Sequence, residues 1–288
     1  FKINLRRELM SKIVFLDVDG TLIDYEAKLP ASAAKAVDQA RANGHKVYIC
    51  TGCSKAEILQ RNLCDLDGMI GGNGAYVEDN GHVVMHQGLS KEDVKNIVDW
   101  CNERHIGFYL EANSGMYCND YMLEQGPETM VKYAKGKGAS LENAKSSAQH
   151  FIDGFIHLHE AELYRVDVNK ISFILRTYLD TLASKVDFPH LVANTWGGKG
   201  EVALFGDLGP TGITKRHAIE VLLDYLHADA KDTISFGDAK IDLSMFECCA
   251  YNVAMGNGGF EIKEAADYIT DDVNEDGLYN AFKYLKLI

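Results

Sequence analysis

The sequence has little basic charge, and this limits the partners that the protein can bind. Its 288 residues include 29 Lys and Arg against 42 Asp and Glu, which gives a formal net charge of −13 at pH 7. Proteins that hold nucleic acid or an anionic membrane surface do so with Lys and Arg. We therefore expect neither nucleic acid nor a membrane as the main partner.

Long apolar stretches are also missing. No run approaches the roughly 20 apolar residues that span a bilayer, and no basic-then-apolar signal segment opens the chain. We therefore expect a cytoplasmic location. Residues 1–9 join no pattern, whereas residues 10–12 (Met-Ser-Lys) resemble a natural start. Residues 1–9 are interpreted as an expression remnant or a lead outside the fold.

A disulfide framework is not indicated either. The chain has seven cysteines, an odd number that is small for this length, so we expect reduced thiols. Cys50 and Cys53 form a C-x-x-C pattern, but Cys50 ends an apolar run and no second pair follows at zinc spacing. A redox or metal-binding role for this pair is therefore not favoured.

His157 and His159 alternate along a predicted strand, which places both imidazoles on one face. Such a pair can bind a metal ion. Because the sequence supplies no evident third ligand, a structural pair is the favoured interpretation.

Two carboxylates at the end of an apolar run are the most informative feature that is present. Residues 12–16 (Lys-Ile-Val-Phe-Leu) are typical of a strand buried on both faces, and Asp17, Asp19 and Gly20 follow directly. Ligands of open α/β sheets bind at the carboxyl ends of the strands. Two acids so close are costly to bury without a cation, which favours a divalent metal.

Other predicted strands also end in polar groups. Thr51 and Gly52 follow residues 47–50, and Asp238 follows residues 233–237, with Asp242 one helical turn later. Lys215 stands just before an apolar helical pattern, where its ammonium and the free amides of a helix start can bind an anion.

In this order, these groups resemble the four motifs of the haloacid dehalogenase (HAD) superfamily of phosphohydrolases. Residues 71–75 (Gly-Gly-Asn-Gly-Ala), 252–257 and 270–277 resemble signatures of its Cof-type branch, which carries a type IIB cap. The resemblance implies an α/β fold, with a Rossmann-like parallel-sheet core and an inserted α+β cap domain.

The order of predicted elements agrees with that division. Strands and helices alternate over residues 10–83 and again over residues 199–288, which is typical of βαβ units and a parallel sheet. Over residues 84–198, strands follow strands with helices between, which favours an antiparallel sheet covered on one face. We expect this segment to be the cap that determines substrate specificity. Within the second core segment, we expect its first strand at residues 201–205.

The resemblance also implies roles for the acids. Asp17 would be the nucleophile, forming an aspartyl-phosphate, and Asp19 would be the general acid and base. Mg²⁺ would be bound by Asp17, Asp238 and the backbone carbonyl of Asp19, and Asp242, the fourth residue of the metal site, would orient the ion.

Thr51, Gly52 and Lys215 would hold the phosphoryl oxygens, and Asn73 would contact substrate. The function implied is Mg²⁺-dependent hydrolysis of small phosphomonoesters, such as sugar phosphates, by a monomer or weak homodimer whose partner is a small phosphorylated metabolite. A phosphosugar mutase and a non-catalytic phospholigand sensor are the alternatives.

Three positions depart from the family pattern. Cys53 replaces the usual arginine after Thr-Gly, and Arg216 replaces the usual glycine after the lysine. Ile241 stands where an asparagine that contacts the phosphate site is usual. An apolar side chain cannot make that hydrogen bond.

Overall fold

The computed structural model describes residues 11–136, 138–196 and 202–288, which divide into two compact units. The core unit contains residues 11–52, 61–85 and 214–288, and the insert unit contains residues 53–60 and the described part of 86–213. The predicted remnant at residues 1–9 and the predicted boundary between residues 198 and 199 lie outside the described residues.

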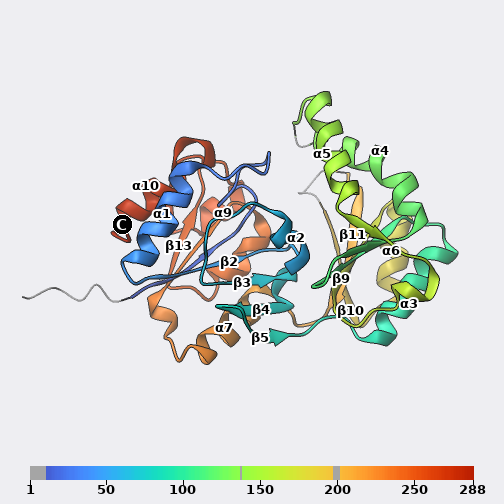
Figure 1. The fold of residues 1–288 in the computed structure, drawn as a ribbon, viewed down its shortest axis with the longest axis horizontal. Helices are drawn as coiled ribbons and strands as arrows, with labels where there is room; N and C mark the ends of the chain where they lie inside the picture. Colours follow the sequence, from blue (N-terminus) through green and yellow to red (C-terminus); the bar gives the residue numbers. More distant parts are fainter. Residues whose placement is uncertain (1–10, 137, 197–201) are drawn as a thin grey trace, which may run out of the picture. The chain divides into compact units, whose positions relative to one another are not determined.

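The core unit is built on a sheet whose described part has eight strands in the order β14-β13-β12-β1-β2-β3-β4-β5 (Figure 1). Pairing is parallel from β14 to β3 and antiparallel between β3 and β4. The predicted parallel sheet is therefore confirmed. The strands are β1 (Ile13–Leu16), β2 (Lys46–Cys50), β3 (Gly68–Gly71), β4 (Tyr76–Asp79), β5 (His82–His86), β12 (Thr233–Gly237), β13 (Tyr251–Ala254) and β14 (Tyr268–Ile269).

Helices cover both faces of this sheet, which is why β1 is apolar throughout and every residue of both β1 and β12 is buried. Phe15 belongs to a cluster with Ile219 and Leu222 of α7, whereas Phe236 contacts Phe282 of α10 with ring centroids 5.3 Å apart. α1 and α10 lie side by side (Figure 1). The helices are α1 (Ala31–Ala42), α7 (Lys215–Tyr225), α8 (Leu243–Phe246), α9 (Phe260–Ala265) and α10 (Gly277–Tyr284).

The insert unit holds a second sheet, with six strands among the described residues in the order β10-β11-β9-β6-β7-β8. Neighbouring strands of this sheet pair antiparallel except for β7 with β8, which are parallel. The strands are β6 (Phe108–Ala112), β7 (Met116–Cys118), β8 (Phe155–His157), β9 (Val168–Ile174), β10 (Leu191–Thr195) and β11 (Phe205–Pro210). The helices are α2 (Lys55–Gln60), α3 (Lys91–Glu103), α4 (Asp120–Gly136), α5 (Leu141–Asp153) and α6 (Tyr178–Asp187).

The prediction that this sheet is covered on one face was wrong. Phe108 and Leu110 pack in one apolar cluster with residues of α3, whereas Tyr109, on the opposite face, packs in another with residues of α4 and α5. Helix α5 was not predicted, because its fully buried residues are the small Ala144 and Ala148, which give a weak apolar signal.

The strand predicted at residues 201–205 of the core was also misplaced. Residues Phe205–Pro210 instead form β11, which pairs with β9 and β10 in the sheet of the insert unit. Two glycines and a proline within β11 resemble a turn in the sequence and conceal the strand. The core unit accordingly resumes at Thr214.

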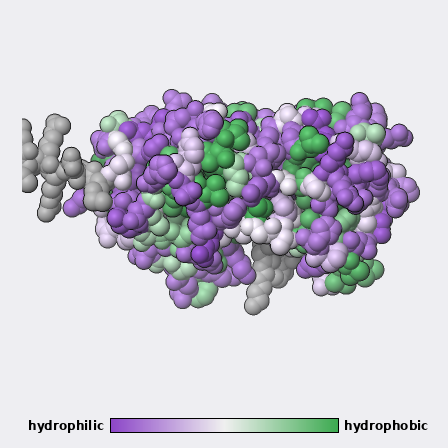
Figure 2. Space-filling view, turned by 90° about the horizontal axis from the view of Figure 1, so that it is seen from below, coloured by the Kyte–Doolittle hydropathy of each residue, from purple (hydrophilic) through white to green (hydrophobic). Residues whose placement is uncertain are grey.

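No helix of the described chain is long and apolar enough to cross a membrane. Hydrophilic residues cover most of the face shown in Figure 2, and the hydrophobic residues form small separate patches there.

Candidate active site

The carboxyl ends of three adjacent core strands bring the predicted groups together. β1 lies between β12 and β2, so Asp17, Asp238 and Thr51 follow neighbouring parallel strands. The backbone N–H of Asp17 still donates to the carbonyl of Phe236 at 3.0 Å, which keeps Asp17 in register beside β12. These three predicted site residues therefore lie at one edge of the sheet.

Three buried carboxylates converge at this edge. One oxygen each of Asp17, Asp238 and Asp242 lies within 4.8 Å of the others. Burial raises the pKa of Asp17 well above its usual range, and the charges of Asp242 and Asp238 raise it further. Burial likewise raises the pKa of Asp238 to about 6. A positively charged group or ion beside these carboxylates would therefore stabilise their ionised forms.

Lys215 supplies part of that charge. Its ammonium, 1% exposed, donates to one oxygen of Asp17 and one of Asp242, both at 2.6 Å. Burial opposes the charged form, but the two carboxylates outweigh it and raise the pKa of Lys215. Lys215 is the first residue of α7, whose N-cap Thr214 accepts a hydrogen bond from the N–H of His217. One lysine against three carboxylates leaves net negative charge.

Asp242 stabilises the loop that follows β12. Its second oxygen accepts from the backbone N–H groups of Asp238 at 3.2 Å and Ala239 at 3.1 Å. Because both oxygens already accept hydrogen bonds, Asp242 holds Lys215 and the Asp238 backbone in place. This fits the predicted orienting role.

Asp238 is held from the other side by two hydroxyl groups. Thr21 donates to one of its oxygens at 3.2 Å, and Tyr25 donates to the other. Gly20 has a φ of +85°, and a Cβ there would lie 2.5 Å from Asp238 Oδ2, so only glycine fits. Tyr25 was not singled out from the sequence, since a tyrosine in a turn carries no motif.

Asp19 lies apart from the trio, with its side chain 46% exposed and paired with the guanidinium of Arg61. Arg61 was likewise missed, because it follows helix α2 in a segment without a recognisable pattern.

Thr51 is buried and is joined to the loop after β3, where the N–H of Asn73 donates to its carbonyl at 3.1 Å. Asn73 adopts a left-handed φ of 56°, and its buried side-chain oxygen finds no hydrogen-bond partner within the described structure. A Cβ at Gly52 would lie 3.0 Å from that oxygen, and one at Gly74 would lie 2.2 Å from the carbonyl of Thr214. The glycines therefore permit the close packing of this loop, and the unpaired amide oxygen is suited to a ligand donor.

Comparison with known proteins identifies the family. The model of the haloacid dehalogenase-like hydrolases matches residues 14–282. The chain belongs to this family. Its Cof-type relatives include phosphatase YwpJ of Bacillus subtilis, 24% identical over 286 residues, with 95% of this chain and 99% of that protein covered.

Two further relatives carry more specific names. The 5-amino-6-(5-phospho-D-ribitylamino)uracil phosphatase YwtE of Bacillus subtilis is 25% identical and covers 93% of this chain and 95% of its own length. The solved structure of the HAD subclass IIB sugar phosphatase BT4131 has a TM-score of 0.73 and 26% identity, over 96% of this chain and 100% of that chain. This chain is accordingly a HAD-family phosphatase of the Cof type.

The three departures from the HAD pattern have different surroundings. Arg216 is half exposed and pairs with Glu220 on its own helix at 2.8 Å. Ile241 is 52% exposed, so it does not replace the missing amide with core packing. Cys53 belongs to the insert unit, and its side chain is half-buried.

Proposed function

We propose that this phosphatase depends on Mg²⁺ and hydrolyses small phosphomonoesters through an aspartyl-phosphate on Asp17. The observation that carries the proposal is the buried trio of Asp17, Asp238 and Asp242 around Lys215. A purely structural cluster would be expected to balance its charges, whereas this one keeps an excess of carboxylate.

The donor set fits magnesium. Carboxylate oxygens are the hard ligands that Mg²⁺ prefers, and the site offers no thiol or imidazole donor among the grouped residues. Asp17, Asp238 and the backbone carbonyl of Asp19 would hold the ion, with Asp242 orienting the site. When bound, the ion would keep Asp17 ionised and reduce its repulsion by the phosphate.

Residues of this chain carry out the two steps of the reaction. A carboxylate oxygen of Asp17 forms a bond to phosphorus while the bond to the leaving oxygen breaks, and Asp19 donates a proton to that oxygen. Asp19 then removes a proton from water, which attacks phosphorus and breaks the bond to Asp17. Lys215 and Thr51 stabilise the phosphoryl oxygens in both steps.

For the substrate we propose a small polar phosphomonoester, such as a sugar phosphate. The support is the similarity to a sugar phosphatase and to a phosphatase named for a phosphoribitylamino compound. We further propose that the insert unit is the cap that selects the leaving group.

A substrate panel tests the proposal. Phosphate release is measured from sugar phosphates, nucleotides, flavin mononucleotide and pyridoxal phosphate, with Mg²⁺ and with excess EDTA. We expect release from one class of small phosphomonoesters, its loss in EDTA and its recovery with added Mg²⁺. Isomerisation of a sugar phosphate without release would favour a mutase, and undiminished release in chelator would refute the magnesium site.

A further inference from the structure

We propose that the insert unit binds a divalent transition ion, for which Zn²⁺ is the test case, through Asp120, His157 and His159. These side chains each offer one donor atom, and the three donors lie within 4.8 Å of one another. Asp120 is the third ligand that the sequence did not reveal. The inference does not depend on the proposed phosphatase mechanism, since no catalytic residue is involved.

The parallel pairing of β7 and β8 explains why these residues meet. Cys118 is the register partner of His157, and the N–H of Leu158 donates to the carbonyl of Cys118 at 3.1 Å. The segments that follow β7 and β8 therefore leave the sheet side by side. Asp120, the first residue of α4, follows β7 by two positions, and His159 follows the end of β8 by two positions.

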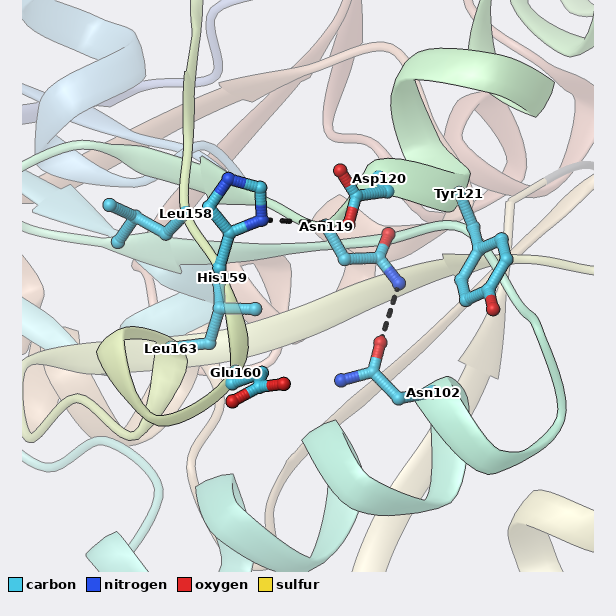
Figure 3. A pocket seen from close by; sticks show the side chains of 8 residues that line it. All are labelled: Asn102, Asn119, Asp120, Tyr121, Leu158, His159, Glu160 and Leu163. Carbon is cyan, nitrogen blue, oxygen red and sulfur yellow. Dashed lines mark hydrogen bonds and ion pairs between the residues drawn. The ribbon is translucent and has the colours of Figure 1, made fainter.

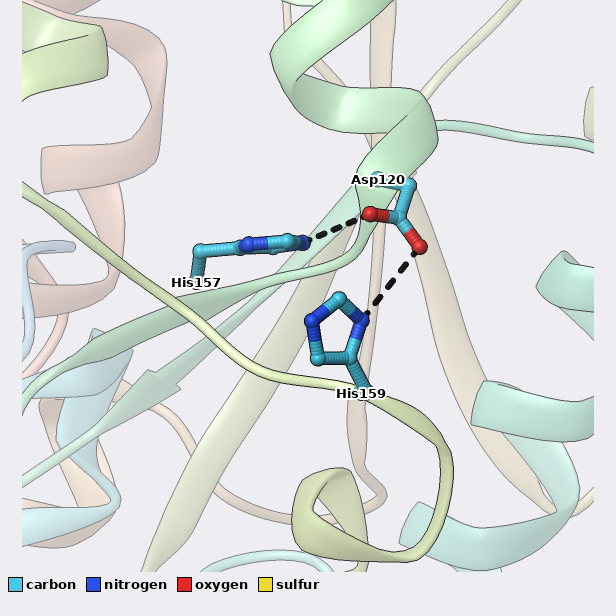
Figure 4. A group of neighbouring side chains, drawn as sticks. All are labelled: Asp120, His157 and His159. Atoms are coloured by element: carbon cyan, nitrogen blue, oxygen red, sulfur yellow. Dashed lines mark hydrogen bonds and ion pairs between the residues drawn. The ribbon is translucent and has the colours of Figure 1, made fainter.

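Both imidazoles point at the Asp120 carboxylate (Figure 4). Nε2 of His157 lies 2.8 Å from one carboxylate oxygen, and Nδ1 of His159 lies 3.6 Å from the other. The ring centroids are 4.4 Å apart. With metal bonds of about 2.0–2.2 Å, donors around one ion lie roughly 3–3.5 Å apart, so small rotations suffice to close the site.

The donor chemistry distinguishes this group from the carboxylate trio of the core unit. Imidazole suits Zn²⁺, Cu²⁺ and Ni²⁺, whereas a site of oxygens alone suits Mg²⁺. All three side chains are exposed enough for an ion to enter, with 70% of the Asp120 side chain accessible. The two sites are therefore expected to select different metals.

A second observation places a cavity beside the ligands. Asp120 and His159 line a cavity of about 360 Å³ together with Asn102, Asn119, Tyr121 and Glu160 (Figure 3). Three protein ligands leave at least one coordination position for water or a small ligand. A bound ion would therefore lie at the wall of a polar cavity with room for such a ligand.

An ordinary ion pair is the competing explanation, and the insert unit supplies a matched control. His190 Nε2 lies 2.7 Å from Asp93 Oδ1, a pairing like that of His157 with Asp120. Among the described residues, the His190 and Asp93 pair belongs to no group of three or more possible metal ligands. His190→Ala therefore removes a His–Asp pair of the same kind without touching the proposed site.

Zinc titration by calorimetry tests the proposal on the full protein, with saturating Mg²⁺ present to occupy the carboxylate trio. We expect a zinc site in the wild type that His157→Ala and His159→Ala each weaken by more than about tenfold, since loss of even an outer-shell partner costs about 10- to 100-fold. His190→Ala should bind zinc like the wild type.

The seven cysteines can also take up zinc, so the decisive quantity is the difference between wild type and the double variant His157→Ala/His159→Ala. Because these residues are exposed, we expect each variant to fold. Circular dichroism checks this. Equal zinc affinity and stoichiometry in the wild type and a folded double variant would overturn the proposal. Equal weakening by His190→Ala would overturn it as well.

Discussion

Among the described residues, two lysines lie buried beside carboxylates, one in each unit, and their surroundings differ. Lys215 of the core unit donates to Asp17 and Asp242 where strands end. Lys170 of the insert unit lies within β9, 3.2 Å from Glu111 of β6. The first cluster has three converging carboxylates, whereas the described residues around Lys170 form no such group.

Carboxylates of the second cluster also accept hydrogen bonds from neutral side chains. Ser172 donates to Glu111 at 2.6 Å, and Asn194 donates to Asp207 at 3.2 Å. Burial raises the pKa of Lys170's partner Glu111 to about 8. The comparison indicates that a buried lysine alone does not mark a catalytic centre; an excess of converging carboxylate at a strand end does.

Asp17→Asn should give the largest difference in kcat between variants of the two clusters. The amide cannot attack phosphorus, so kcat should fall by at least about a thousandfold. Glu111→Gln, the matched change in the other cluster, should reduce kcat by less than about tenfold. Steady-state phosphate release measures both, and an equal loss in the two variants would contradict the distinction.

Removing each lysine tests whether both clusters respond to metal. Lys215→Met and Lys170→Met each remove an ammonium from beside buried carboxylates, which should cost roughly 3–5 kcal/mol of unfolding free energy. Added Mg²⁺ should restore stability to the Lys215 variant, because ligand that binds the folded state stabilises it, and not to the Lys170 variant. Thermal unfolding with and without Mg²⁺ measures this, and rescue of both variants would show that the metal does not discriminate between the clusters.

Asp19→Asn should lower kcat by about a hundredfold, the usual size of lost general acid and base catalysis. The loss should shrink for substrates with good leaving groups, since these need no proton. Rates for alkyl and aryl phosphates measure the dependence. An effect that is independent of the leaving group would assign Asp19 and its partner Arg61 a binding role.

Ile241→Asn should improve the phosphate site by a smaller amount. An amide hydrogen bond to a charged group is worth roughly 1.5–3 kcal/mol, so kcat/KM should rise about tenfold if the amide is aligned. Because Ile241 is half exposed, the melting temperature should change little. A folded variant without kinetic gain would show that the site has adapted to the isoleucine.

The pH dependence of stability should report the Glu111 cluster. Because its folded pKa of about 8 lies above the usual 4.5, the protonated folded form contributes stability that is complete below about pH 4.5. That contribution is lost as the pH rises through 8. Glu111→Gln should remove this part of the dependence, as seen in melting temperatures from pH 5 to 9, and parallel wild-type and variant curves would contradict the assigned shift.

The core site could be predicted from the sequence because its residues follow strands that are visible as apolar runs. Asp17, Thr51 and Asp238 needed only the rule that parallel strands end at one edge. Tyr25 and Arg61 come from turns, and their approach to Asp238 and Asp19 depends on tertiary packing.

The insert unit could be predicted less well for the same reason. Lys170 and Ser172 alternate with apolar residues, which in sequence is typical of a strand with one solvent face. The structure buries both side chains. Asp120 lies 37 residues before His157. Helix α5 buries only small alanines fully, and glycines and a proline interrupt strand β11, so the sequence signal of both elements is weak.

Trapping the covalent intermediate tests the central claim most directly. The enzyme is quenched during turnover and treated with borohydride, which reduces an aspartyl-phosphate to homoserine, and the modified residue is located by peptide mass spectrometry. The mechanism predicts homoserine at position 17, dependent on substrate and absent from Asp17→Asn. Active enzyme that yields no modified residue 17, or that carries the modification elsewhere, would contradict it.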